Sequence, residues 1–250
     1  MGEGAPGRVV VCGAGIAGLA VAHRLAAAGC EVLVAERAAG PREQGFVLDF
    51  WGLGVDAARR MGVLPGLRER SRRVSRWAFV DERGRSRAEL DVAGFSRAQR
   101  GALLTVARPD VERVLRGSLG GGVEVRYGCP VVGFDDDGSG VLVSLGDGTR
   151  VAADLLVGAD GIRSSVREAL FGSGALRYLG LHMAVWSFED PDLHGWLGDR
   201  WCLTDSWGAQ VAFSAADAGW VTAFGAHRSA VPRRPEQPRS VVGAVYGSLG

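Results

Sequence analysis

The fold is decided by the stretch Arg8-Val9-Val10-Val11-Cys12-Gly13-Ala14-Gly15-Ile16-Ala17-Gly18, near the N-terminus. Val9 to Cys12 is a short apolar run, typical of a buried strand in a parallel sheet. Three glycines follow at the spacing Gly13-x-Gly15-x-x-Gly18, and a helical pattern runs from Ile16 to Ala28. A second apolar run, Glu31 to Ala35, predicts the next strand. This order of strand, glycine turn, helix and strand is that of a βαβ unit that binds a dinucleotide.

Each glycine of the motif has a physical role. Gly13 allows the tight turn from strand to helix, and Gly15 lacks the Cβ that would keep a pyrophosphate away from the backbone. Gly18 lets the helix pack closely on the strand. The helix that begins with Ile16 and Ala17 would direct unpaired N–H groups and a partial positive charge at the phosphates. The motif therefore predicts a dinucleotide site, with a βαβ unit that binds nothing as the alternative.

Glu36 ends the second strand, eighteen residues after Gly18. A carboxylate at that position can accept hydrogen bonds from a ribose diol. It would repel a 2′-phosphate. FAD or NAD is therefore expected at this site rather than NADP.

Composition limits the class of protein. The chain has 250 residues, 47% of them apolar and 23% charged, which is typical of a globular protein with one large domain or two. A net charge of +1 predicts no attraction to nucleic acid or to an anionic membrane. The arginine cluster at residues 68–76 is accordingly interpreted as a solvated helix end. All 29 basic residues are arginine, which excludes Schiff-base lysine chemistry.

The four cysteines are Cys12, Cys30, Cys129 and Cys202. They form no Cys-x-x-Cys pair and no metal-ligand spacing, so we expect reduced thiols in a cytoplasmic protein and no metal site.

The middle of the chain predicts alternating elements. We expect strands at 45–51, 103–106 and 123–127, helices at 54–61 and from Arg108 to the glycines at 120–122, a β-hairpin at 73–92 that turns at 81–84, and a meander at 131–135, 141–145 and 150–152. A buried strand at 155–159 then enters Asp160-Gly161-x-x-Ser164-x-x-Arg167 and a short helix that ends at Phe171.

Beyond Ala175 the sequence predicts β segments at 176–188, 209–214 and 220–226, followed by a loop at 228–239. Their tryptophans, Trp186, Trp201, Trp207 and Trp220, could stack on an aromatic substrate, but on a sheet they more often belong to the core. Val241, Val242, Val245 and Leu249 form one apolar stripe of a final helix.

The combined motifs resemble those of a known family. With Gly13-x-Gly15-x-x-Gly18, Glu36-Arg37, Arg108 at a helix start and the Asp160-Gly161 motif, the chain is similar to the single-component FAD-dependent aromatic hydroxylases, flavin monooxygenases of the p-hydroxybenzoate-hydroxylase type. Val47-Leu48-Asp49-Phe50-Trp51-Gly52 resembles the branch that modifies polyketides and tetracycline-like antibiotics. The resemblance covers essentially the whole chain.

The resemblance implies an α/β fold, in which a Rossmann-like FAD-binding domain is interleaved with a β-sheet substrate domain. The implied FAD-binding segments are 1–72 and 103–174, and the implied substrate segments are 73–102 and 175–250.

It also implies roles for single residues. Glu36, with Arg37 beside it, would bind the adenosine ribose, and Gly15 with its neighbours the pyrophosphate. Arg108 would reach the pyrophosphate or ribityl side, and the backbone near Val131 would contact adenine. Asp160 would lie by the pyrophosphate. Asp160 as a simple helix cap and Arg108 as an ordinary surface arginine are the alternatives.

The implied activity is hydroxylation of a small aromatic or polyketide-like molecule with NAD(P)H and O2. NAD(P)H would bind transiently, since no second glycine motif is present. The flavin carries such chemistry, and no GxSxG, HExxH or Cys–His nucleophile signature is visible, so no catalytic side chain is expected. The alternatives are an FAD-dependent reductase or dehydrogenase and a non-catalytic flavoprotein.

The family also has a second flavin motif, a Gly-Asp-Ala turn, after its substrate sheet. Gly198-Asp199-Arg200 does not match it, and the sequence ends at Gly250 before the motif would occur. The expectation is that the chain is a fragment or a truncated product, less stable than a longer version and weak in FAD binding. The partner surface of the final helix is expected in the absent part.

Overall fold

The computed structural model describes residues 7–43, 45–81, 83–98, 103–232 and 236–247. Two compact units are each built from three segments of the chain. The first unit comprises Met1–Gln44, Ala57–Glu69 and Arg108–Arg177, and the second comprises Gly45–Asp56, Arg70–Ala107 and Tyr178–Gly250. The domain boundaries expected from the sequence stay predictions.

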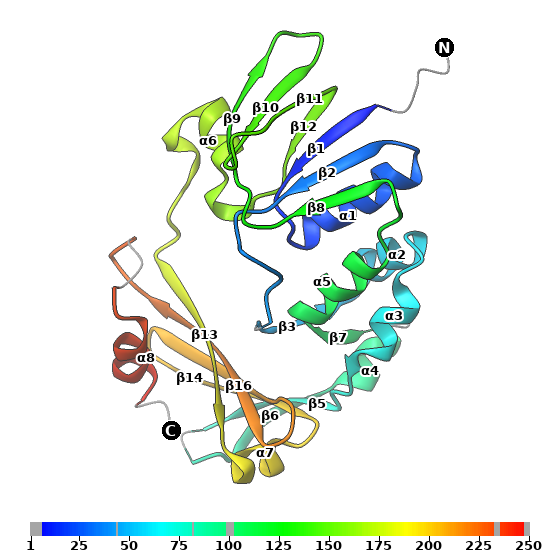
Figure 1. Ribbon diagram of the computed structural model, residues 1–250. Helices are drawn as coiled ribbons and strands as arrows, with labels where there is room; N and C mark the ends of the chain where they lie inside the picture. The colour runs from blue at the N-terminus through cyan, green and yellow to red at the C-terminus, as the bar shows by residue number, and fades with distance from the viewer. Residues whose placement is uncertain (1–6, 44, 82, 99–102, 233–235, 248–250) are drawn as a thin grey trace. The chain divides into compact units, whose positions relative to one another are not determined.

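A four-stranded parallel sheet forms the centre of the first unit, in the order β12-β1-β2-β8 (Figure 1). Its strands are β1 (Arg8–Cys12), β2 (Glu31–Ala35), β8 (Val123–Arg126) and β12 (Leu155–Gly158). β1 and β2 are apolar almost throughout because both faces of the sheet are covered. The register aligns Cys12 with Ala35 and with Gly158, so three strands end at the same level. The strands predicted at 9–12, 31–35, 123–127 and 155–159 are confirmed.

Different elements cover the two faces of this sheet. On one face lies α1 (Ile16–Ala27), which also contacts α5 (Arg108–Gly117) (Figure 1). The opposite face packs on an antiparallel sheet of β9 (Val131–Asp136), β10 (Val141–Leu145) and β11 (Arg150–Ala153). The core between the two sheets includes Val10, Cys12, Leu33, Val143 and Leu145. The predicted meander is therefore confirmed.

Several short helices lie between these strands in the sequence. They are α2 (Leu53–Arg60), α3 (Leu64–Glu69), α6 (Ser165–Phe171) and the 3-10 turns η1 (Gly161–Arg163) and η2 (Ser173–Ala175). The helices predicted at 54–61 and up to Phe171 are confirmed.

A six-stranded sheet dominates the second unit, in the order β13-β16-β15-β14-β5-β6. Its strands are β5 (Arg76–Val80), β6 (Ser86–Asp91), β13 (Leu181–Glu189), β14 (Arg200–Ser206), β15 (Ala209–Ala215) and β16 (Trp220–Arg228). β5 and β6 form the predicted hairpin, of which Glu82 lies outside the described residues. A small sheet of β3 (Val47–Phe50), β7 (Leu104–Ala107) and β4 (Ser71–Arg72) and the helix α4 (Val92–Ala98) complete this part of the unit.

Among the described elements of the second unit, β4, α4, α7 and β14 were not predicted. The helix α7 (Pro191–Leu197) begins after Asp190, whose side chain accepts a hydrogen bond from the Leu193 N–H at 2.9 Å. An Asp-Pro pair at a helix start is a readable signal. β14 pairs antiparallel with the adjacent β15 and in parallel with β5, which is far away in the sequence, and its own sequence is a short, partly polar alternation. The strand predicted from residue 176 begins at Leu181 instead.

The final helix, α8 (Pro238–Tyr246), corrects one expectation. Its partner surface does not lie in an absent part of the protein, because Val242, Val245 and Tyr246 pack on Val211 and Ala223 of the second unit's own sheet. Tyr246, which was not in the predicted stripe, is its buried anchor. Leu249 lies outside the described residues.

The arginine cluster is only partly a solvated helix end. Arg68 is exposed near the end of α3, as predicted. The interpretation is wrong for Arg72 and Arg76, which lie in strands: Arg72 donates to the Ala215 carbonyl oxygen at 3.2 Å, and Arg76 pairs with Glu89 at 2.6 Å. Among the described residues, no helix has the length and apolar character to cross a membrane.

Candidate functional site

The candidate site lies in the first unit, at the carboxyl ends of its parallel strands. Gly13, Glu36 and Asp160 each follow the end of a strand, namely β1, β2 and β12. The Gly13 N–H donates to the Ala35 oxygen at 2.8 Å, which joins the glycine turn to the end of β2. The carboxyl ends of parallel strands are where α/β sheets bind ligands.

The three motif glycines have different surroundings. Gly13 has φ +107°, and a Cβ there would lie 2.7 Å from the Ala159 oxygen. A Cβ on Gly18 would overlap the Gly13 carbonyl oxygen and lie 3.4 Å from Cγ1 of Val11. Both glycines are therefore required by the turn and by close helix packing, as predicted. At Gly15 the space is open.

Helix α1 presents an uncapped N-terminus beside this open space. No side chain caps Gly15, and no acidic residue lies in the first turn. The first intrahelical bond runs from the Leu19 N–H to the Gly15 oxygen at 2.9 Å. The preceding N–H groups of Ile16, Ala17 and Gly18 have no partner inside the helix. Such an end attracts an anion.

Glu36 stabilises the glycine turn through hydrogen bonds. Its Oε2 accepts a hydrogen bond from the Ala14 N–H and its Oε1 one from the Ala38 N–H, both at 2.8 Å. Each carboxylate oxygen keeps a further lone pair for a ribose hydroxyl. The neighbouring Arg37 is exposed. This stabilising role was not predicted, because it depends on the turn folding back over β2.

Asp160 has one satisfied and one unsatisfied oxygen. Its Oδ2 accepts from the Ser165 N–H at 2.7 Å and from Ser165 Oγ at 3.1 Å, so Asp160 does help to cap α6. Its Oδ1 is buried without a hydrogen-bond partner among the described residues. Burial raises the pKa of Asp160, but hydrogen bonds from Ser164 and Ser165 outweigh it and hold the pKa below its ordinary value. A buried carboxylate oxygen at this place can accept a hydrogen bond from a polar ligand.

Cys12 and Val131 lie beneath this turn. Burial, followed by the negative charge of Asp160, raises the pKa of Cys12 to about 12, so the thiol stays protonated and unreactive. A backbone hydrogen bond from Val131 to Cys12 brings the start of β9 to the site.

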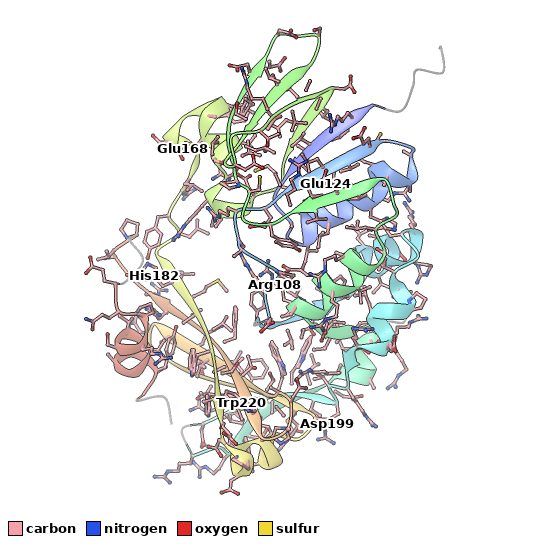
Figure 2. All side chains as sticks on the ribbon, in the orientation of Figure 1. Arg108, Glu124, Glu168, His182, Asp199 and Trp220 are labelled. Atoms are coloured by element: carbon pink, nitrogen blue, oxygen red, sulfur yellow. The ribbon has the colours of Figure 1, made fainter. Side chains whose placement is uncertain are left out.

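Arg108 is the first residue of α5, and its side chain is 22% exposed (Figure 2). Its Nη2 atom lies 3.8 Å from the position that a Cβ on Gly15 would occupy. The same atom lies 2.9 Å from Oε1 of Glu112, one turn further along α5. Sequence reasoning missed Glu112, although an acid four residues after an arginine on a helix is a readable signal.

The second unit offers a different kind of surface. Side chains alternate between the two faces of a strand, so Met183, Val185, Leu203 and Phe224 point away from the face that α7 and α8 cover. Met183 and Val185 are exposed, and the ring of Phe224 lies 5.5 Å from that of Phe46. These four positions form an apolar area on a face that also carries Ser187, Thr222 and Gln210.

The tryptophans of the second unit lie in two environments, the core and the surface. Trp186 packs on Tyr246 at 5.1 Å within the core under α8, as the core interpretation predicts. The core interpretation is wrong for Trp207, which is 98% exposed at the turn between β14 and β15, and Trp220 is also exposed (Figure 2).

Comparison with known proteins identifies the family. The model of the family described as FAD binding domain matches residues 7–213. The chain belongs to the FAD binding domain family. The resemblance to flavin monooxygenases, the α/β fold class and FAD as the cofactor of this family are thereby confirmed.

Individual relatives and solved structures show how far the similarity extends. The flavin-dependent monooxygenase eupH of Phoma sp is 35% identical over 191 residues, which are 72% of this chain and 44% of eupH. The aurachin C monooxygenase/isomerase of Stigmatella aurantiaca is 31% identical over 211 residues, 84% of this chain and 54% of that protein. The crystal structure of tetracycline destructase Tet(55) matches this chain with a TM-score of 0.81 at 22% identity. The match covers 100% of this chain and 64% of the destructase chain. The chain thus spans about half the length of the curated relatives it matches.

The residues of the first unit fit a dinucleotide such as FAD. An uncapped helix end and a guanidinium face the open space at Gly15, which suits a pyrophosphate. The unpartnered Oδ1 of Asp160 and the free lone pairs of Glu36 suit hydroxyl donors. Among the described residues, no group of His, Cys, Asp and Glu could hold a metal ion.

Proposed function

We propose that this chain binds FAD in its first unit and serves a monooxygenase that hydroxylates a small aromatic or polyketide-like molecule with NAD(P)H and O2. The observation that carries the proposal is the open space at Gly15, which lies between the uncapped end of α1 and the Arg108 guanidinium. The relatives named as flavin-dependent monooxygenases support the activity.

The proposed contacts follow from the chemistry of each group. The N–H groups of Ile16 and Ala17 and the guanidinium of Arg108 bind the pyrophosphate at Gly15. Glu36 accepts hydrogen bonds from the adenosine ribose, and Arg37 follows it at the edge of the site. The backbone at Val131 contacts adenine, and the Oδ1 atom of Asp160 accepts from a further hydroxyl of the cofactor.

The flavin supplies the redox chemistry when bound, accepting electrons from NAD(P)H and activating O2. The protein residues then bind and orient. The buried thiol of Cys12, with its raised pKa, offers no nucleophile, so no proton transfer is assigned to a side chain of this site.

The proposed substrate surface is the apolar area around Met183, Val185 and Phe224 on the second unit's sheet. Met183, Val185 and Phe224 present thioether, aliphatic and aromatic groups there, which suit an aromatic ring better than a charged substrate. A further relative, the 6-hydroxynicotinate 3-monooxygenase of Pseudomonas fluorescens, is 31% identical and supports a ring-containing substrate. The four cysteines are free thiols, which supports the proposed cytoplasmic location.

The test is a flavin-fluorescence titration of the purified protein with a variant that fills the open space. A Cβ on Gly15 would meet only the Arg108 side chain, at 3.8 Å, so Gly15→Ala should fold but weaken FAD binding. Gly120→Ala is the matched control, because a Cβ there would have no neighbour within 4 Å. Equal FAD affinity in both variants would contradict the proposed site. NAD(P)H oxidation that depends on an aromatic substrate distinguishes a monooxygenase from a reductase or an inert flavoprotein.

A further inference from the structure

Helix α5 buries a carboxylate that the proposed function does not use. Glu112 is 5% exposed and lies between the buried residues Val111 and Leu115. Burial of a charged carboxylate is unfavourable unless a partner compensates it. The charge that faces it is the guanidinium of Arg108, at 2.9 Å.

The geometry of this pair is unusual. Oε1 of Glu112 lies within ion-pair distance of Arg108 Nη2, yet it receives no aligned hydrogen bond from the described residues. Charge attraction therefore holds the two groups together. The same Nη2 atom lies 3.8 Å from the Cβ position of Gly15, so the guanidinium reaches both Glu112 and the Gly15 side.

Helix stability does not explain the pair. Arg108 stands at the N-terminus of α5, where a cation is disfavoured by the helix dipole. An acid that follows its basic partner by four residues is also the less stabilising order. Asp110 and Arg113, on the same helix, form an ion pair in the favourable order. The Arg108–Glu112 pair therefore calls for an explanation outside the helix.

We propose that Glu112 is a positioning residue that holds the Arg108 guanidinium over Gly15 before the dinucleotide binds. A long arginine side chain otherwise loses rotamer freedom when it orders around a phosphate. The buried carboxylate removes that cost in advance, because it fixes one side of the guanidinium and leaves the other side open. This inference rests on the proposed function, in which Arg108 contacts the pyrophosphate.

The experiment compares FAD dissociation constants of Glu112→Ala, Glu112→Gln, Arg108→Ala and the double variant Arg108→Ala/Glu112→Ala. Glu112→Ala should weaken FAD binding by about tenfold. Glu112→Gln keeps the shape of the side chain but removes the charge that attracts Arg108, so it should weaken FAD binding nearly as much as Glu112→Ala. In the Arg108→Ala background, loss of Glu112 should add no further weakening.

The control is Asp110→Ala, which removes the other ion pair of α5. It should leave FAD affinity within about twofold of the wild type, because it perturbs the helix but not Arg108. Thermal midpoints of all variants without FAD show whether each one is folded.

The outcomes separate this inference from the proposed function. If Arg108→Ala weakens binding but Glu112→Ala does not, or if Glu112→Ala tightens it, the inference is wrong and the proposed site stands. An equal loss from Glu112→Ala with and without Arg108 also overturns it, because Glu112 would then act through the fold. No effect of Arg108→Ala overturns both the proposed Arg108 contact and the role of Glu112.

Discussion

Gly18 is the most closely packed glycine of the site, so we expect that adding a single methyl group there strongly destabilises the protein. A Cβ on Gly18 would overlap the Gly13 carbonyl oxygen and stand 3.0 Å from the Gly13 carbonyl carbon. Both belong to the backbone, and the turn is held by the bond from Gly13 to the Ala35 oxygen, so neither can rotate away. Overpacking of a rigid interior costs about 1–3 kcal/mol, and we expect Gly18→Ala near 3 kcal/mol.

The same substitution has the opposite expected sign elsewhere. Gly117, the last residue of α5, has no atom within 4 Å of its Cβ position. Gly117→Ala should therefore stabilise the protein by roughly 0.5–1 kcal/mol through helix propensity and reduced chain entropy. The pair of variants separates crowding at Gly18 from a general effect of replacing a helical glycine.

The unfolding assay must report on the first unit, which contains both Gly18 and Gly117. All seven tryptophans lie in the second unit, so tryptophan fluorescence during urea unfolding reports that unit alone. Far-UV circular dichroism reports both. We expect Gly18→Ala to lower the midpoint of the dichroism transition by roughly 1–2 M urea. An unchanged midpoint would refute the packing argument, and so would an equal loss from Gly117→Ala.

Three further predictions concern single side chains. Glu36→Ala should weaken FAD binding by roughly 1–3 kcal/mol in a fluorescence titration, because it removes both a charged acceptor and the hydrogen bond to the Ala14 N–H of the glycine turn. Unchanged affinity would exclude a cofactor contact. Arg108→Ala should release FAD more readily than Arg113→Ala, whose side chain is half exposed and paired within α5, and equal release would make Arg108 an ordinary surface residue. Burial, and then the charge of His182, hold the pKa of His227 below its ordinary value, so the folded state binds fewer protons there than the unfolded state. Stability should therefore fall as the pH drops from about 6.5 towards the lowered pKa, and His227→Asn should flatten that part of a pH series of urea midpoints; an equal slope in both proteins would contradict the assignment.

Much of the first unit could be predicted because its signals are local. The apolar run before Gly13, the glycine spacing and the helical pattern after it lie within one short stretch, and each implies a backbone conformation. The meander was predictable for the same reason. Gly138 and Gly148 mark its turns and adopt φ +82° and +85°.

Elements whose partners are distant in the sequence were harder to predict. β14 pairs with its sequence neighbour β15 and also, in parallel, with the distant β5, and α8 packs against Val211 and Ala223. Neither β5 nor the sheet under α8 can be identified as a partner from nearby residues, because burial depends on which surfaces the folded chain brings together. The stripe in α8 was visible in the sequence, whereas the sheet that receives it was not.

The candidate site divides in the same way. The sequence by itself determined that a glycine turn, an acid at Glu36 after the second strand and an arginine at a helix start would be present, because each depends on residue type and spacing. Only the tertiary structure decided that Arg108 faces Gly15, that Glu112 is buried beside it, and that one oxygen of Asp160 has no hydrogen-bond partner among the described residues. These are relations between side chains from separate elements. Their distances are set when helices and strands pack together, which no local periodicity encodes.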